Sequence, residues 1–108
     1  MDIESLRDYV LQKSGVTEGF PFGEDVLVFK VNNKLFLLLS LNSQPLQFNA
    51  KCNPDEALEL REEYPDAVLP GYHMNKKHWN TIIINGTIAN KQLLQMIDNS
   101  YELVAKRK

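Results

Sequence analysis

The sequence has a single cysteine, Cys52, so no disulfide can form within the chain. It also lacks a long apolar run, because even Leu35–Leu39 is flanked by Lys34 and Ser40, well short of the roughly 20 residues that span a bilayer. The first residues, Met1–Glu4, are acidic where a secretory signal would be basic and then apolar. We therefore expect a reduced, cytoplasmic protein with no membrane partner.

Motifs of several enzyme classes are missing as well. Gly19–Gly23 lacks the lysine of a phosphate-binding loop, and there is no serine nucleophile elbow or paired-carboxylate motif. His73 and His78 do not have the i, i+4 spacing of a helical zinc site. Cys52 lies in an apolar register, where cysteine behaves as a small buried hydrophobe. We expect no enzyme activity, catalytic residue, metal or cofactor; the alternative is a thiol or metal-dependent enzyme using Cys52, His73 and His78.

Charge is unevenly distributed along the chain. The net charge is -2, but residues 1–69 carry -6 and residues 70–108 carry +4. A local positive face is therefore compatible with an acidic protein. The alternative is that the acids at positions 55–63 simply form one solvated helix.

Three helices are predicted. Apolar residues recur every three or four positions over Asp2–Lys13, with Asp2 as the N-cap, and again over residues 89–105. Asn53 is expected to cap a middle helix that has Pro54 at its first position, with Glu56 closing a capping box. This helix should end before Pro65.

Strands are predicted between the helices. Val26–Val31 and Lys34–Leu41 are joined by an Asn-Asn turn, and residues 46–52 alternate between apolar and polar. Ala67–Leu69 is a short apolar segment, and Thr81–Ile84 is a further strand that ends in an Asn-Gly turn. These elements indicate one α+β domain over residues 1–108, with a mainly antiparallel sheet and helices packed on one face.

The segment from Tyr72 to Asn80 is the most unusual part of the sequence. It contains two lysines, two histidines, two asparagines and the only tryptophan. Lysines beside an aromatic ring are typical of nucleic-acid contacts. Asn75 could cap a single helical turn that directs Lys76 and Lys77 at a phosphate.

The other members of this segment have two interpretations. His78 and Asn80 could add hydrogen-bond donors, and Trp79 could stack on a base, although a lone tryptophan entering a strand more often packs in the core. For the lysine pair, the alternative is a solvated loop. Further positive charge could come from Lys30, from Lys51 and from the tail Lys106–Lys108, unless that tail is frayed.

Several segments together resemble the MmcQ/YjbR family, small bacterial proteins generally described as predicted DNA-binding. The resemblance covers nearly the whole chain, through Pro21–Gly23, Leu27–Val31, Phe48–Pro54, Tyr72–Asn80 and Ile97–Val104. It implies a frataxin/CyaY-like α+β fold. It also raises iron binding by analogy, but the acids of the first helix are sparse.

Two functions are therefore carried forward. The first is a non-enzymatic module that binds the DNA phosphate backbone through Asn75, Lys76, Lys77, His78, Trp79 and Asn80. The second is a protein-interaction or small-ligand module in which this loop is mainly structural. It predicts a ligand footprint on the sheet around Phe22, Phe48 and Trp79.

Overall fold

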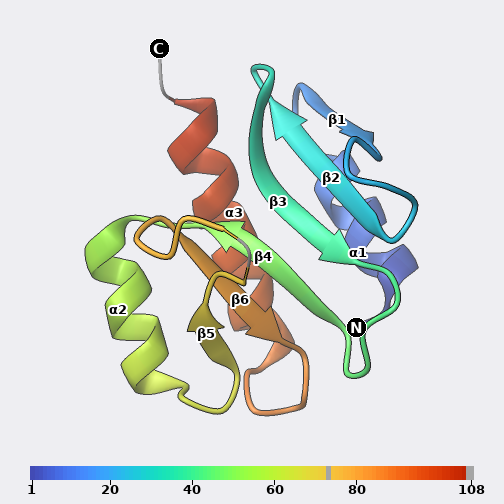
Figure 1. Ribbon diagram of the computed structural model, residues 1–108. Helices are drawn as coiled ribbons and strands as arrows, with labels where there is room; N and C mark the ends of the chain where they lie inside the picture. The colour runs from blue at the N-terminus through green and yellow to red at the C-terminus, as the bar shows by residue number, and fades with distance from the viewer. Residues whose placement is uncertain (73, 107–108) are drawn as a thin grey trace.

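The computed structural model describes residues 1–72 and 74–106. Six strands in this part of the chain form one antiparallel sheet with the order β1-β2-β3-β4-β6-β5 (Figure 1). In chain order the elements are α1 (Ile3–Leu11), β1 (Val16–Gly19), β2 (Val26–Val31), β3 (Lys34–Ser40), β4 (Gln47–Lys51), α2 (Pro54–Glu63), β5 (Val68–Pro70), β6 (Trp79–Ile83) and α3 (Asn90–Ala105).

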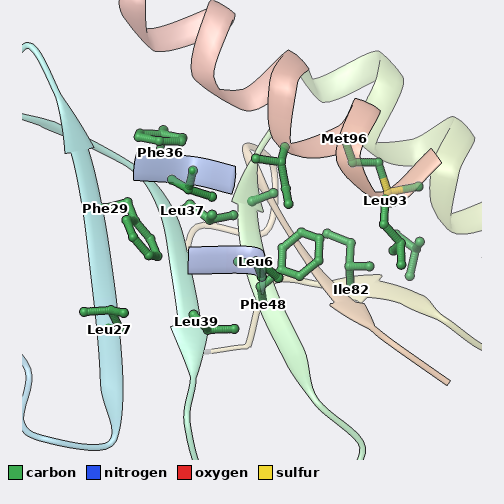
Figure 2. Close-up of a cluster of buried hydrophobic side chains, with 14 of the residues drawn as sticks. Leu6, Leu27, Phe29, Phe36, Leu37, Leu39, Phe48, Ile82, Leu93 and Met96 are labelled. Carbon is green, nitrogen blue, oxygen red and sulfur yellow. The ribbon is translucent and has the colours of Figure 1, made fainter. Parts of the chain in front are cut away.

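The helices cover one face of the sheet. In Figure 1, α1 and α3 lie behind the sheet and α2 lies beside β5 and β6. Between the layers lies the main core, whose largest fully buried side chains include Phe29, Phe36 and Phe48 (Figure 2). Each such burial contributes roughly 1.5–3 kcal/mol. The predicted α+β class, with helices on one face of an antiparallel sheet, is confirmed.

The helix starts follow from their capping side chains. Asp2 Oδ1 accepts a hydrogen bond from the Ser5 N–H at 2.8 Å, and Ser5 Oγ accepts one from the Asp2 N–H at 3.1 Å. Asn53 caps α2 as predicted, accepting from the Asp55 N–H at 3.0 Å. The predicted capping box with Glu56 is wrong, because Glu56 Oε1 instead accepts from Asn99 Nδ2 at 3.1 Å and ties α2 to α3.

A β-bulge decides which side chains of β3 reach the core. Phe29 pairs with Leu37 while Lys30 pairs with Leu35, so Phe36 is an extra residue on β3. Phe36 and Leu37 consequently both join the core under the helices, whereas Leu35 packs on the opposite face. The turn before β3 is the predicted Asn-Asn turn, and both asparagines have positive φ, 52° and 64°.

Two strands differ from the sequence prediction. β1 was not predicted, since its Val-Thr-Glu-Gly sequence has little apolar content. β6 begins at Trp79, two residues before the predicted start at Thr81, so the tryptophan is itself part of the sheet. Phe48 is fully buried in the main core, which removes it from the predicted ligand footprint.

Candidate functional site

The two faces of the sheet differ in charge. We call the face of the sheet that points away from the helices the open face. Its side chains lie in rows that run across the strands. One row runs Val28, Leu38, Asn49, Thr81, Leu69, and the next runs Val26, Ser40, Gln47, Ile83. The open face also carries Lys30 and Lys51, which belong to strands without any carboxylate.

Carboxylates are instead concentrated in the helices. Those within helices are Glu4, Asp8, Asp55, Glu56, Glu59, Glu62, Glu63, Asp98 and Glu102. The strands contain one carboxylate, Glu18 of β1, and it forms an ion pair with Arg7 of α1. Charge is therefore segregated by layer: the helices are acidic, and the open face has lysine as its only charged strand residue.

The loop between β5 and β6 covers part of the open face. Met74 packs on a small apolar cluster formed by Val28, Leu38 and Trp79. At the start of the loop, the Gly71 N–H donates to the Trp79 carbonyl at 2.9 Å. A Cβ at Gly71 would lie 2.7 Å from Trp79 Cβ, so only glycine allows this close approach.

Two of the predicted contact residues are internal. Trp79 is only 7% exposed and belongs to the apolar cluster beneath Met74. Asn80 is 1% exposed, and both ends of its amide are used: Nδ2 donates to the Ala57 carbonyl at 3.2 Å, and Oδ1 accepts from Arg61 Nε at 2.7 Å. The core packing that the sequence favours for Trp79 is therefore confirmed. Asn80 is also buried, so both residues brace the loop and the surface open to a nucleic acid belongs to the other members of the predicted set.

Arg61 is a positioning residue that the sequence did not reveal. Its guanidinium donates to Asn80 and to the carbonyls of Trp79 and Lys76, so α2 holds the loop and the start of β6. Arginine differs from lysine in carrying five N–H donors in a rigid planar fork, which suits it to acceptors held in fixed directions. The available signal was its isolation, since Arg61 is the only basic residue in α2.

The predicted turn around Asn75 is present, but it is not a helix. Asn75 Oδ1 accepts from the Lys77 N–H at 2.9 Å, and the His78 N–H donates to the Asn75 carbonyl at 3.2 Å. Lys76 and Lys77 are exposed on this turn, and His78 is half-buried. Neither lysine takes part in an ion pair within residues 1–72 and 74–106.

The loop ends beside the lysine of β4. The Cys52 N–H donates to the His78 carbonyl at 2.7 Å, and Lys51 pairs with Trp79 across the sheet. Lys51 therefore lies at the same end of the sheet as the turn that carries the lysine pair. Lys106 of the predicted tail forms an ion pair with Glu102 at 2.9 Å, and Arg107 and Lys108 lie outside the described residues.

A hollow of about 520 Å³ opens on the same face, within the range typical of ligand sites. Its lining comes from β2, β3, β4 and two loops: Phe22, Val26, Leu38, Ser40, Gln47, Asn49, Tyr72 and Met74. Phe22 and Tyr72 are 63% and 66% exposed. Of the three residues in the predicted ligand footprint, Phe22 is the one that lines this hollow.

Of the residues considered for catalysis, the structure describes Cys52 and His78, which are joined through their backbones. Burial, and secondarily the charge of Glu56, raises the pKa of the Cys52 thiol from 9.0 to about 11, so the thiol is protonated at neutral pH. His73 lies outside the described residues. Within those residues, no three His, Cys, Asp or Glu side chains gather as a metal site would require, and no helix could cross a bilayer.

Comparison with known proteins identifies relatives of this chain. The YjbR family model matches residues 11–103. The uncharacterised protein YbdF of Escherichia coli O157:H7 is 37% identical over 109 residues, covering 96% of this chain and 88% of that protein. The uncharacterised protein YjbR of Escherichia coli K12 is 28% identical over 102 residues, covering 94% and 86%.

Solved structures agree with these relatives. The crystal structure of Deinococcus radiodurans protein DR2400 matches with a TM-score of 0.92 and 35% identity, covering 97% of this chain and 79% of that one. A Pseudomonas syringae protein matches with a TM-score of 0.81 and 27% identity, covering 96% and 99%. The resemblance seen in the sequence is thereby confirmed, and the chain belongs to the YjbR family.

Proposed function

We propose that this protein is a non-enzymatic, cytoplasmic module that binds DNA against the open face of its sheet. The observation that carries the proposal is the segregation of charge between the layers. Lysine is the only charged residue that the strands present on the open face, and the helices behind it hold most of the carboxylates. Such an arrangement attracts a polyanion to one side of the molecule and repels it from the other.

In this proposal the lysines contact phosphates. Lys76 and Lys77 project from an ordered turn, with Lys51 at the neighbouring strand end and Lys30 further along the face. Phosphate contacts of this kind position a nucleic acid without reading its sequence. Asn75 shapes the turn, and the half-buried His78 is close enough in sequence to add a donor.

An amide-shift titration of the labelled protein with a short duplex and a single strand, at low and moderate salt, tests the proposal. We expect saturable shifts around residues 75–78 and Lys51 that weaken steeply as salt is added. K76A/K77A should weaken binding to all sequences alike, and K91A, an exposed lysine of α3, is the matched control. The absence of shifts with either form of DNA at low salt would refute the proposal.

The hollow favours a second candidate, a small-ligand or protein-interaction module in which the loop serves to build the hollow's wall. This candidate predicts indifference to DNA and a footprint on Phe22 and Tyr72, both of which line the hollow. The same titration separates the two candidates, because the lysine turn and the hollow involve different residues.

A further inference from the structure

The floor of the hollow contains an amide whose orientation is set by a chain of hydrogen bonds. The Tyr72 N–H donates to Thr81 Oγ1 at 3.0 Å, and the Thr81 hydroxyl donates to Asn49 Oδ1 at 2.6 Å. The hydroxyl thus accepts from the backbone through a lone pair and gives its single hydrogen to Asn49. The oxygen of the Asn49 amide is thus engaged, and its Nδ2 remains as a hydrogen-bond donor.

This donor lies among both polar and apolar neighbours. Asn49 lines the hollow together with Leu38 of the same row and with Ser40 and Gln47 of the next. Within the described part of the chain, the side chains of Ser40 and Gln47 form no hydrogen bond. A flat ligand that lies on Leu38 could therefore be met at its edge by an oriented amide donor and two adaptable polar groups.

Aromatic rings flank the same hollow. Phe22 and Tyr72 both line it, and about two-thirds of each residue is exposed, 63% and 66%. Exposed aromatic rings can bind unpaired bases, because every base has a face that can stack. A base in a duplex is already stacked and paired, so it could not enter the hollow.

We propose that the hollow binds an unpaired nucleobase of single-stranded DNA and prefers thymine to adenine. The base stacks on Phe22, and a base carbonyl accepts from Asn49 Nδ2. Thymine offers two carbonyl oxygens at its edge, whereas adenine offers only ring nitrogens beside its amino donor, so we expect thymine to bind more tightly than adenine. This inference rests on the proposed DNA-binding function and adds strandedness and base preference to it.

Fluorescence anisotropy tests the proposal with a labelled thymidine strand, an adenosine strand of equal length and the duplex formed by the two. We expect the thymidine strand to bind most tightly. F22A should weaken its binding by roughly fivefold to a hundredfold, the range for losing one stacking partner. L58A removes an exposed apolar side chain from α2 and should leave binding unchanged, serving as the control.

A second variant tests the oriented donor. N49L keeps a similar shape but removes the amide, and it should abolish the preference for thymidine over adenosine. Because N49L also deprives the buried Thr81 hydroxyl of its acceptor, its fold must be checked by circular dichroism. F22A alters an exposed loop residue, so it remains informative even if N49L unfolds.

The outcomes distinguish this inference from the broader function. Salt-sensitive DNA binding that is equal for single strand and duplex, or unaffected by F22A, would overturn the base pocket and leave the DNA module standing. No binding to any of the three probes at low salt would overturn both, and would direct attention to a protein or small-molecule occupant of the hollow.

Discussion

Arg61 shows how one side chain can position a surface that it does not belong to. It is half-buried between α2 and β6, and its donors are used by the Lys76 carbonyl, the Trp79 carbonyl and the Asn80 side chain. The lysine turn is consequently fixed by a residue on the acidic helix. An arginine is suited to this because its planar group donates in several directions at once.

Replacing Arg61 with alanine should therefore destabilise the protein. R61A leaves the buried Asn80 Oδ1 without its partner, and we expect the free energy of unfolding to fall by roughly 1–3 kcal/mol. Urea unfolding measures the change, with K91A as a control for loss of an exposed positive charge. R61K should recover only part of the loss. An unchanged urea midpoint for R61A would contradict the role of Arg61 in holding the loop.

Cys52 allows a prediction about pH. Because burial raises the pKa of its thiol to about 11, the thiolate fraction at pH 8 should be about a hundredfold lower than in the unfolded chain. Alkylation by iodoacetamide, followed by mass spectrometry, should be slow and accelerate toward pH 11, whereas in urea it should level off near the ordinary value of 9.0. Equal rates in the folded and unfolded states would show that the thiol is not desolvated.

The raised pKa of Cys52 also makes the free energy of unfolding depend on pH. The folded state keeps its proton to higher pH than the unfolded state, so this thiol's contribution is complete below pH 9.0 and is lost as pH rises toward about 11. Replacing Cys52 with serine or alanine should remove this loss of stability when the free energy of unfolding is measured as a function of pH.

At the level of single residues, the sequence indicated which segment is chemically unusual better than it indicated which of its side chains are exposed. It singled out the 72–80 segment and favoured a core position for Trp79, but it could not show that Asn80 is also buried while Lys76 and Lys77 are exposed. That distinction depends on where β6 begins and on Arg61, which is distant in sequence and lies in an unremarkable acidic helix. Pairing partners of this kind are tertiary facts, and a local pattern does not contain them.

Among the elements, the β2–β3 hairpin is the one most clearly specified by its sequence. Its turn needs two residues with positive φ, and Asn32 and Asn33 supply them. Asn32 Nδ2 also donates to the Ala105 carbonyl at 3.0 Å, so the turn is tied to the end of α3.

A substitution at Asn33 tests this requirement. N33V forces a β-branched residue to φ 64° and should lower the free energy of unfolding by roughly 1–3 kcal/mol. N33G, which accepts that conformation without strain, is the matched control and should be neutral or stabilising. Thermal unfolding followed by circular dichroism measures both, and equal effects of valine and glycine would refute the conformational explanation.

Elements with a strong periodic or capping signal were predicted well, and weak ones were not. The Asp2 and Asn53 caps and the β2–β3 hairpin were foreseeable from residue types alone. β1 was missed because its pairing with β2, and not its own composition, makes it a strand. The bulge at Phe36 was equally invisible, since a continuous apolar run gives no sign of which residue is extra.

At the scale of the whole molecule, charge segregation should control the rate of DNA binding. Reversing a charge on the open face, K51E, should reduce the association rate constant about tenfold at low ionic strength and less as salt is added. K91E changes net charge identically but lies on α3, so its effect should be small. Stopped-flow measurements compare the two, and equal effects would mean that net charge, not its placement, governs encounter.

The fold class was predictable at this scale, whereas the charge pattern was misplaced. The sequence located the asymmetry between its two halves, but the structure locates it between two layers, each of which draws on both halves. Lys30 and Lys51 belong to the acidic half of the chain and nevertheless lie on the basic face.

The ends of the strand order have a consequence for how the protein behaves at high concentration. The outermost strands are β1, with four residues, and β5, with three, and β5 ends in Pro70, which has no N–H to offer. Another polypeptide that approached either border would find few free backbone donors and a charged Glu18. The sheet is therefore protected against growth by strand addition, which guards the protein against fibril formation even though one broad side of the sheet is left uncovered by helices.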